Sequence, residues 1–324
     1  MNIKIKAGII GAAGYTGGEL VRILLHHPKT EIAFCFSRSH NGEKISAIHS
    51  DLLGDTDLIF TNEINKDIDV LFLCLPHGEA KPFLEKNTFS PSVKIIDLSN
   101  DFRLKDNADD FIYGLPELNK HKIKEAANIA NPGCFATAIQ LSLLPLAQQN
   151  LLQSDIHISG ITGSTGAGIA LNEATHFTWR NNNTSVYKAF THQHLSEIKE
   201  SITQLQTTFN QTINFIPYRG NFTRGIITTT YIDFDGSLDV AKAIFTRFYV
   251  DTKFVFIADK NIDLKQVINT NKCLLYLEKH ESKLMIVSVI DNLIKGASGQ
   301  AVQNMNLIFD FDEDEGLKLK PIAY

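Results

Sequence analysis

Cysteine is scarce in this sequence, and the four cysteines are too scattered for a disulfide framework or a structural zinc site. Cys35, Cys74, Cys134 and Cys273 lie far apart along 324 residues and lack the paired spacing of zinc ligands. The histidines supply no third ligand at a suitable spacing. We therefore expect neither disulfides nor a bound metal, so each cysteine must be explained by packing or by reactivity.

The sequence also lacks an excess of positive charge, a signal peptide and a long hydrophobic run. A formal net charge of -5 argues against a nucleic-acid partner. Residues 1–7 alternate isoleucine with lysine and lead directly into an apolar strand, and no apolar run reaches membrane-spanning length. With 44% hydrophobic and 21% charged residues, the composition is typical of a soluble globular protein. We expect a cytoplasmic protein without membrane contact.

The first 130 residues or so have the pattern of a doubly wound α/β domain. Short β-rich runs alternate there with longer helical or mixed connections, which is typical of βαβ units and a parallel sheet. The runs lie at 3–10, 31–36, 69–75, 93–97 and 128–130.

After Cys134 the pattern changes to strand-like runs with few helices between them. This predicts an α+β domain with a mostly antiparallel or mixed sheet, one face of which helices at 194–209 and 238–249 would cover. The runs lie at 155–162, 213–217, 225–234, 254–258, 272–278 and 283–290.

A last helix at about 297–309 has a broad apolar side and is expected to return to the first domain. We therefore predict a dinucleotide-binding domain of residues 1–133 and 297–324. Residues 134–296 would form a catalytic, substrate-binding and oligomerisation domain.

A glycine-rich turn follows the first predicted strand. Residues 11–17 (Gly-Ala-Ala-Gly-Tyr-Thr-Gly) precede an amphipathic stretch at 19–27, which Pro28 closes. Glycines let the backbone approach a pyrophosphate, and the following helix start supplies N–H donors. Where an NAD enzyme would place an acidic residue for the ribose, this chain has Ser37 and Arg38, which suit a 2′-phosphate. The turn predicts dinucleotide binding, with NADP favoured over NAD.

Cys134 stands where a short apolar run ends and a helical pattern begins. Pro132 and Gly133 before it suit a tight turn into that helix. The backbone N–H groups and dipole at a helix start favour a thiolate, which is a nucleophile near neutral pH. The other three cysteines lie inside apolar strand-like runs, where cysteine acts as a small inert hydrophobe.

His192 and His194 stand close to Tyr187 and Glu197, at the predicted start of a helix. A histidine near its ordinary pKa can give and take a proton, as acyl transfer to a thiol requires. Alone, such a pair is more often a surface pair or an incidental metal chelator, and the separate reactive cysteine favours catalysis.

Two arginines and a second glycine loop are further candidates for anion contacts. Arg103 and Arg224 could grip a phosphate or carboxylate with two parallel hydrogen bonds, although either could instead form a surface ion pair. The loop at 163–168, which includes Ser164 and Gly166, could wrap anionic or nicotinamide groups with backbone donors, or could be an ordinary flexible loop.

Together these motifs resemble the N-acetyl-γ-glutamyl-phosphate reductases, a family of the semialdehyde dehydrogenase group that serves arginine biosynthesis. The resemblance spans nearly the whole chain, and Gln193 and Ser196 depart from it, since the family more usually has Arg and Pro there. The matching motifs lie at 11–17, 75–78, 97–103, 113–118, 131–138, 163–168, 192–198, 223–226 and 291–304.

The resemblance implies NADPH-dependent reduction of N-acetyl-glutamyl 5-phosphate to the 5-semialdehyde and phosphate. Cys134 would form a thioester and His192 would act as acid or base. Arg103 would receive the phosphate, His194 and Glu197 would orient or bind substrate, and Arg224 is a weaker carboxylate candidate. The cofactor residues it implies are Gly11, Gly14, Tyr15, Thr16, Gly17, Ser37, Arg38, Pro76, Ser164 and Gly166.

Two other interpretations remain. One is a related phosphorylating semialdehyde dehydrogenase acting on an N-succinyl-glutamyl, aspartyl or carrier-linked phosphate, although the chain shows no dense basic stretch for docking a carrier. The other is an NADP-binding sensor, which would leave Cys134 and His192 without a role. The family resemblance also suggests a homo-oligomer, a dimer or a tetramer.

Overall fold

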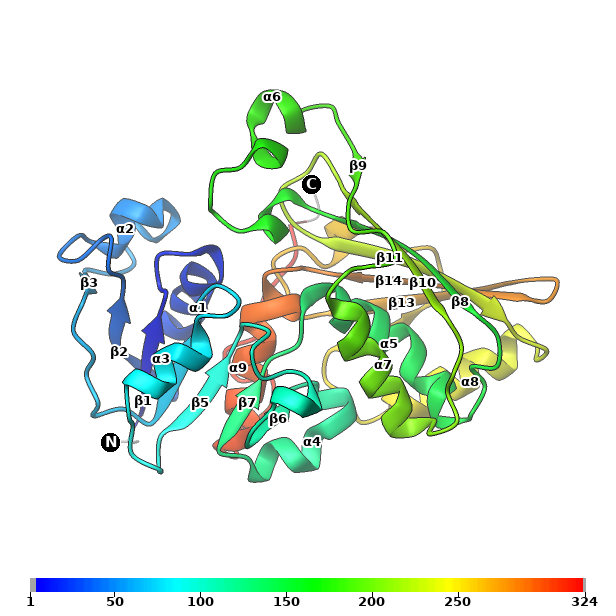
Figure 1. Ribbon diagram of the computed structural model, residues 1–324, viewed down its shortest axis with the longest axis horizontal. Coiled ribbons are helices and arrows are strands. Elements are labelled where there is room, and N and C mark those ends of the chain that lie inside the picture. Colours follow the sequence, from blue (N-terminus) through cyan, green and yellow to red (C-terminus); the bar gives the residue numbers. More distant parts are fainter. Residues whose placement is uncertain (1–3, 323–324) are drawn as a thin grey trace. The chain divides into compact units, whose positions relative to one another are not determined.

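The computed structural model describes residues 4–322, which form two compact units (Figure 1). The first unit consists of Met1–Pro132 and Ala297–Lys318, and the second of Gly133–Gly296 and Leu319–Tyr324. The sequence analysis placed all of residues 297–324 with the first domain. In the structure Lys320 belongs to the second unit, where its backbone carbonyl accepts a hydrogen bond of 3.3 Å from Asn269 Nδ2.

The first unit contains a seven-stranded sheet with the order β3-β2-β1-β4-β5-β7-β6, and all of its strand pairs are parallel. The strand order reverses between β1 and β4. Doubly wound sheets bind ligands at such a point, beyond the carboxyl ends of the strands. The strands are β1 Ile5–Ile10, β2 Thr30–Phe36, β3 Phe60–Thr61, β4 Val70–Leu73, β5 Lys94–Asp97, β6 Phe111–Tyr113 and β7 Asn128–Ala130.

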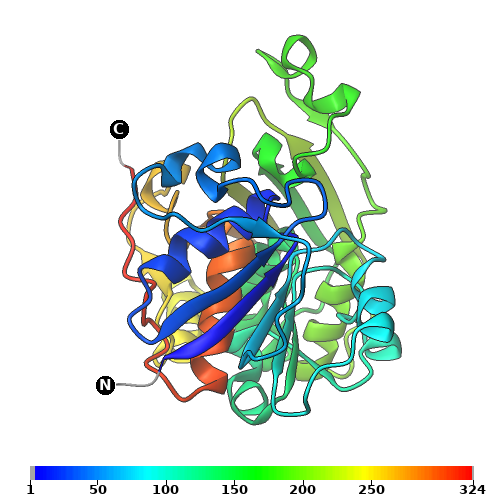
Figure 2. The same cartoon turned by 90° about the vertical axis from the view of Figure 1, so that its left-hand side faces the viewer.

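Helices cover this parallel sheet. Helix α9 contacts α1, α4 and strand β5, and Figure 2 shows it in red beside the blue α1. The C-terminal helix thus returns to the first unit, although it begins two residues later than expected because a π-helical turn, Ile294–Ser298, precedes it. The helices of this unit are α1 Tyr15–Leu25, α2 Ile45–Ile48, α3 Ala80–Lys86, α4 Pro116–Glu125 and α9 Gly299–Ile308.

The second unit contains a mixed seven-stranded sheet with the order β12-β13-β14-β11-β8-β10-β9. The pairs β8/β10 and β12/β13 are parallel, and the other neighbours are antiparallel. The predicted combination of a parallel doubly wound sheet with a mixed second sheet is therefore confirmed. The strands are β8 Ile156–Thr162, β9 Ser185–Val186, β10 Ile213–Arg219, β11 Ile226–Asp233, β12 Val255–Ala258, β13 Cys273–His280 and β14 Lys283–Ile290.

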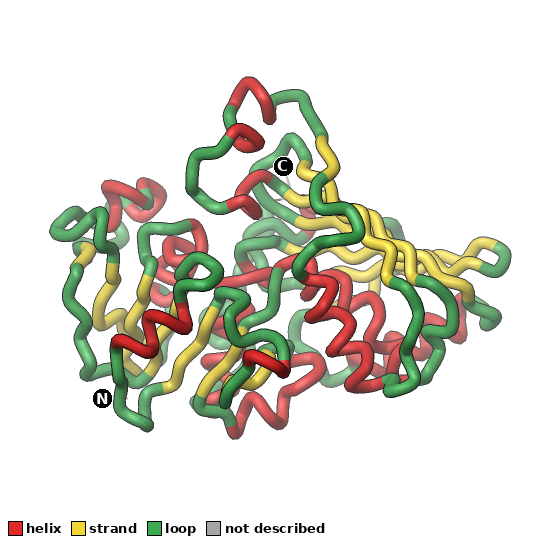
Figure 3. The backbone as a smooth tube through the Cα atoms, viewed as in Figure 1, coloured by secondary structure: helices red, strands yellow, loops and turns green. Residues whose placement is uncertain are grey.

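The helices α5 (Cys134–Gln148), α7 (His194–Leu205) and α8 (Leu238–Tyr249) lie on one side of the mixed sheet (Figures 1 and 3). Helix α5 is the central one: it contacts α7, α8 and strands β11 and β14, and it is buried from Phe135 to Ala147. The short helix α6 (Phe177–Arg180) lies on a segment that projects from this sheet in Figure 1.

Pro145 lies inside α5 and has no N–H to donate to the carbonyl four residues earlier. That carbonyl, on Leu141, accepts a hydrogen bond of 2.5 Å from the hydroxyl of Tyr249 at the end of α8. The side chain of one helix thus replaces a backbone donor missing from another, and the two helices are joined at that point. Within residues 4–322, no helix combines the length and the apolar character needed to cross a membrane.

Candidate active site

The glycine turn of the first unit forms where the sequence predicts it, between β1 and α1. Gly11 has φ +80°, and a Cβ there would collide with the backbone carbonyl of Cys74 at the end of β4. A Cβ at Gly17 would lie 2.6 Å from Ala12 Cα. Glycine is therefore required at both positions for the turn to sit this close to β4 and for α1 to pack this close to the turn.

Helix α1 begins directly after this turn, at the carboxyl end of β1. Gly14 is its N-cap, no side chain caps this end, and the first turn contains no acidic residue. The N–H groups of Tyr15, Thr16 and Gly17 belong to this first turn and have no carbonyl partner inside the helix. This arrangement is suited to a pyrophosphate, which the N–H groups and the helix dipole both favour.

The other predicted cofactor residues of this unit lie at the ends of the neighbouring strands. Ile10 is paired with Phe36 of β2 and with Leu73 of β4. Ser37 and Arg38 therefore leave the sheet on one side of the glycine turn, and Pro76 follows β4 on the other side. Ser37 is buried, whereas Arg38 is exposed and can reach a ligand.

Cys134 is the first residue of α5 in the second unit and is half-buried. Gly133, the N-cap, has an extended backbone and no side chain to cap the helix. This places the thiol at the positive end of a fifteen-residue helix, as the sequence predicts. The remaining cysteines have different surroundings, since burial raises the pKa of the Cys35 and Cys74 thiols to about 12 and Cys273 is fully buried.

His194 and Glu197, in the first turn of α7, pack against the residue before the thiol. Glu197 Oε2 accepts a hydrogen bond of 3.0 Å from the Gly133 N–H. The ring of His194 occupies the space that a side chain at position 133 would need, and its Nε2 lies 3.9 Å from Glu197 Oε1. Both side chains are buried, with 5% and 4% exposure. They hold the start of α5 in place.

His192 is buried among aromatic rings. Its ring centroid lies 5.6 Å from that of Phe135, 5.5 Å from Phe215 and 5.8 Å from Tyr187. Burial, together with the charge of Lys188, lowers the pKa of His192 to about 4. The imidazole is therefore neutral at physiological pH.

The hydrogen bonds of His192 assign its tautomer. Nδ1 accepts a hydrogen bond of 3.2 Å from the backbone N–H of His194. In the neutral ring the proton is therefore on Nε2, which makes that nitrogen a donor.

Tyr187 and Arg219 complete this cluster, and sequence reasoning did not assign Arg219. The Arg219 guanidinium lies 4.7 Å from the centroid of the Tyr187 ring. Burial, together with the charge of Cys134, raises the pKa of Tyr187 to about 12, so the phenol keeps its proton at physiological pH. The available signal was an arginine two residues beyond the predicted strand, which in the structure extends to Arg219 and places it on the same face as Phe215.

Gly296, in the π-helical turn, lies against the thiol from another side. A Cβ at position 296 would lie 2.8 Å from Cys134 Cβ. The Gly296 N–H donates to the backbone carbonyl of Asp291 at 2.9 Å. The fully buried Asp291 side chain is also the carboxylate that contacts Arg224, whose Nη2 lies 3.1 Å from Oδ2. Arg224 therefore has a counter-ion within the protein.

Arg103 is buried in the first unit and contacts backbone carbonyls. Its Nε donates to the carbonyl of Asn131 at 2.8 Å, and Nη2 donates to that of Leu98 at 2.9 Å. The carboxyl of Asp97 is also close to it, and burial raises the pKa of Asp97 to about 6. These bonds stabilise the two segments that follow β5 and β7.

The loop at 163–168 does not offer its backbone donors in the way the sequence suggests. The Ser164 N–H donates to the carbonyl of Phe222 at 2.9 Å, and the Gly166 N–H donates to that of Gly163 at 3.2 Å. The loop is thus bonded to the segment before β11. A cofactor contact of Ser164 or Gly166 would have to use other atoms and remains a prediction.

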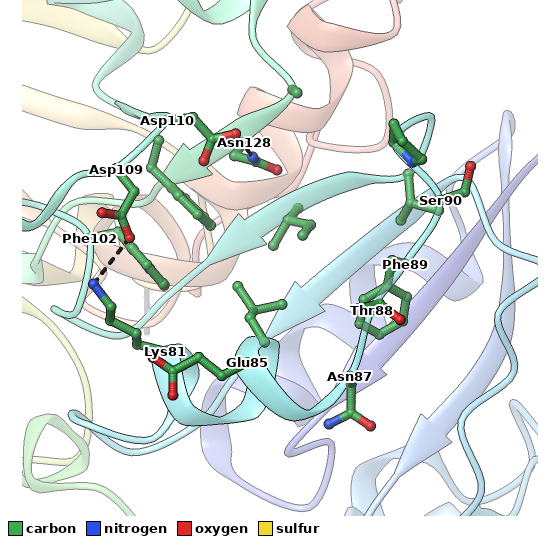
Figure 4. A pocket seen from close by; sticks show the side chains of 16 residues that line it. Lys81, Glu85, Asn87, Thr88, Phe89, Ser90, Phe102, Asp109, Asp110 and Asn128 are labelled. Carbon is green, nitrogen blue, oxygen red and sulfur yellow. Dashed lines mark hydrogen bonds and ion pairs between the residues drawn. The ribbon is translucent and has the colours of Figure 1, made fainter.

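The first unit also contains a pocket of about 690 Å³ (Figure 4). It is lined by residues at the amino ends of β5, β6 and β7 and at the end of α3, the opposite edge from the glycine turn. An ion pair of 3.1 Å between Lys81 and Asp109 and a hydrogen bond of 2.7 Å between Asn128 and Asp110 lie at its rim. Among residues 4–322, no three His, Cys, Asp or Glu side chains are grouped to hold a metal ion.

Two family models match this chain. Residues 6–126 match "Semialdehyde dehydrogenase, NAD binding domain", and residues 134–292 match "Semialdehyde dehydrogenase, dimerisation domain". The chain is 58% identical to the N-acetyl-gamma-glutamyl-phosphate reductase of Christiangramia forsetii over 98% of both chains. It is 57% identical to that of Parabacteroides distasonis over 99% of this chain and all of the relative.

Solved structures share the fold at low sequence identity. Aspartate semialdehyde dehydrogenase II of Vibrio cholerae, complexed with ASA, has a TM-score of 0.74 at 16% identity and covers 95% of this chain and 98% of its own. Aspartate semialdehyde dehydrogenase with NADP from Candida albicans has a TM-score of 0.70 at 14% identity and covers 94% of this chain and 98% of its own. These two structures support the fold.

Proposed function

This chain belongs to the semialdehyde dehydrogenase family, among the N-acetyl-gamma-glutamyl-phosphate reductases, and from that premise we propose its reaction. The enzyme reduces N-acetyl-glutamyl 5-phosphate to N-acetyl-glutamate 5-semialdehyde and phosphate with NADPH. The observation that supports this most directly is the cluster at the start of α5, where Gly296 lies against Cys134, and His194 and Glu197 hold Gly133.

The first unit fits NADPH. The uncapped start of α1 offers N–H donors to the pyrophosphate, and Gly11 and Gly17 allow the turn and the helix start to pack as closely as this arrangement requires. Exposed Arg38 suits the 2′-phosphate. When bound, NADPH supplies the hydride that the reduction of an acyl group requires.

Cys134 supplies the nucleophile. Its thiolate attacks the acyl carbon, the carbon–sulfur bond forms, and the bond from that carbon to the phosphate oxygen breaks. Phosphate leaves with the electron pair and takes up the proton that the overall reaction consumes. The product of this half-reaction is a thioester on Cys134. After reduction, collapse of the resulting hemithioacetal oxyanion breaks the carbon–sulfur bond, releases the aldehyde and restores the thiolate.

His192 acts on the substrate oxygen as a neutral hydrogen-bond donor. Its proton is on Nε2 because Nδ1 accepts from the backbone, and burial disfavours the charged ring. A neutral imidazole can stabilise a developing oxyanion without titrating. Because the oxyanion collapses directly to aldehyde and thiolate, the reduction step needs no separate acid. This role is narrower than the acid or base role expected from the sequence.

The other predicted substrate residues divide by their contacts. His194 and Glu197 position the start of α5, so we assign them to orienting the thiol. Arg224 is paired with Asp291, which supports a structural role. Arg103 contacts two backbone carbonyls, and its predicted role with the phosphate remains open to test.

The reverse reaction tests this function. Purified protein is incubated with NADP⁺, phosphate and N-acetyl-glutamate semialdehyde, and NADPH formation is followed by absorbance. N-succinyl-glutamate and aspartate semialdehydes are run in parallel, and arsenate replaces phosphate in one series. We expect activity with the N-acetyl substrate. If none of the three semialdehydes gives NADPH formation while NADPH still binds, the result would support the sensor interpretation instead.

Two cysteine variants accompany the assay. Cys134→Ser should abolish turnover and leave NADPH binding intact, because the glycine turn and Arg38, which we propose hold the cofactor, are in the first unit. Cys273→Ala removes a fully buried thiol of the second unit and serves as the matched control with retained turnover. Near-normal phosphate-dependent activity of Cys134→Ser would exclude the thioester.

We also infer a homo-oligomer assembled through the second unit, and the choice between dimer and tetramer is left to measurement. The matched family model for residues 134–292 is a dimerisation domain. The projecting segment exposes large apolar side chains, with Leu171 fully exposed, Phe177 75% and Trp179 49% exposed. Exposed apolar groups of this size mark contact surfaces. Light scattering of the wild-type protein and of a Leu171→Ser/Phe177→Ser variant tests this inference, since the variant should have the lower molar mass in solution. The cytoplasmic location remains a prediction.

A further inference from the structure

The Arg180 side chain contacts the backbone of Arg219 in the second unit, and neither arginine has a carboxylate partner among the described residues. Arg180, at the end of α6, donates from Nη1 to the backbone carbonyl of Arg219 at 2.6 Å and from Nη2 to Ser185 Oγ at 2.9 Å. The Nε atoms of both arginines are buried and have no hydrogen-bond partner. Among residues 4–322, no Asp or Glu side chain forms an ion pair with either guanidinium.

This arrangement differs from other arginines of the chain. Arg22 is paired with Glu19 at 2.7 Å, and Arg224 is paired with Asp291 at 3.1 Å. Arg180 is only 6% exposed, and burial together with the neighbouring charge of Arg219 lowers its pKa. A buried charge without a counter-ion is unfavourable. An anion between the two guanidinium groups would supply that counter-ion.

The pair is connected to the start of α5 through aromatic side chains. The Arg219 guanidinium contacts the ring of Tyr187, 4.7 Å from its centroid. Tyr187 in turn lies edge-on to His192, whose ring packs edge-on against Phe135, the residue after the thiol. Arg219 also shares a face of β10 with Phe215, whose ring packs on Phe135, the residue after the thiol.

We propose that Arg180 and Arg219 bind the α-carboxylate of the substrate, the end remote from the reacting acyl carbon. This inference rests on the proposed function and names the residues that select its substrate. In a glutamyl phosphate, four carbon–carbon bonds separate the carboxylate carbon from the acyl carbon. The phosphate, by contrast, is attached to the acyl carbon itself and must lie beside the thiol rather than beyond the Tyr187 ring. A planar carboxylate also matches the two parallel donors of a guanidinium.

The same pair would select N-acylated substrates. A free α-amino group carries a positive charge next to the carboxylate, and two guanidinium groups would repel it. Acylation removes that charge and leaves the carboxylate as the single charge at this end of the substrate. The pair thus disfavours an amino-acid substrate such as an aspartyl phosphate.

The test combines a charge-removing variant with a substrate that lacks the carboxylate. Arg219→Met is assayed with N-acetyl-glutamate semialdehyde and with 4-acetamidobutanal, which is the same molecule without its α-carboxylate. We expect the variant to lose about 100-fold in kcat/KM on the first substrate, as for a charged hydrogen bond removed from a protected site. On 4-acetamidobutanal, wild type and variant should be equal within about threefold, because the partner group is already gone. Arg247→Met, on the exposed side of α8, is the matched control and should equal wild type on both substrates.

Other outcomes overturn the inference. Equal losses on both substrates would mean that Arg219 is structural, and a raised KM for phosphate would mean that the pair binds the phosphate group. Arg180→Lys and Arg219→Lys keep the charge and the fold, so they serve if the methionine variant is unstable; their losses should also be confined to the carboxylated substrate. Calorimetry with N-acetyl-glutamate as probe gives a readout without turnover, and undiminished binding by Arg219→Met would contradict the inference. An inactive wild-type enzyme would instead refute the proposed function. Calorimetry separates this result from a failure of the carboxylate inference, because it measures ligand binding without turnover.

Discussion

Glu197 accepts a hydrogen bond of 3.0 Å from the backbone N–H of Gly133, the residue directly before Cys134. The carboxylate therefore acts on the thiol through the chain that carries it. It belongs to the first turn of α7, and Gly133 is the N-cap of α5, so this one bond joins the starts of two helices. Both partners are buried, which protects the bond from competition with water.

Replacing Glu197 separates this positioning role from substrate binding. Glu197→Ala leaves the buried Gly133 N–H without its acceptor, so we expect the free energy of unfolding to fall by about 2 kcal/mol. We also expect kcat to fall by more than about tenfold, because the start of α5 is no longer held in place. Glu197→Gln keeps an oxygen acceptor of the same size and should stay within a few-fold of wild type. Urea unfolding, steady-state kinetics and the iodoacetamide alkylation rate of Cys134 measure the three effects. A raised KM with unchanged kcat in both variants would instead indicate direct substrate binding.

Gly296→Ala tests the packing around the thiol from the opposite side. The added methyl group would lie 2.8 Å from Cys134 Cβ and 3.2 Å from its Cα, which is too close without a shift of the helix start. We expect kcat to fall at least tenfold because the thiol is displaced from the acyl carbon. NADPH titration should show unchanged affinity. Full activity in this variant would mean that the contact is relieved without moving Cys134.

Stability should depend on pH through His192. Its pKa is about 4 in the folded protein against an ordinary value of 6.5. As the pH falls through 6.5 the unfolded chain takes up a proton that the folded chain does not, so folded stability is lost between pH 6.5 and about 4. The loss should reach about 2 kcal/mol at pH 5. The glutamine of His192→Gln cannot titrate. From urea unfolding curves, the free energy of unfolding of this variant should therefore change less between pH 7 and pH 5 than that of wild type.

The same titration bears on the mechanism. If His192 is a neutral donor, its titration should not affect kcat near pH 6.5. The pH profiles of kcat for wild type and His192→Gln should therefore have the same shape in that range. An NMR titration that places the His192 midpoint near its ordinary value would contradict both expectations.

Arg38 should set the preference for NADPH. Arg38→Ala removes the exposed charge that we propose binds the 2′-phosphate and should raise KM for NADPH by about tenfold, with little change for NADH. The exposed Arg247→Ala is the control for a general charge effect. Equal changes for the two cofactors would show that Arg38 does not contact the 2′-phosphate.

Local patterns in the sequence determined much of this protein. The glycines at positions 11 and 17 are needed by a turn that passes close to neighbouring backbone, and they belong to one short motif of the chain. The start of α5 at Cys134 follows from the turn residues before it. The strands of both sheets could be located from runs of apolar residues because the period of side chains along a strand is a local property.

Tertiary structure alone decided how the charges are paired. Arg224 was the candidate for a carboxylate ligand, yet folding brings Asp291 to it, whereas Arg180 and Arg219 meet without a counter-ion. The neutral state of His192 likewise depends on three rings from separate segments that bury it. Ion pairing and burial are set by strand order and helix packing between residues distant in the chain, and no local pattern encodes which of them will meet.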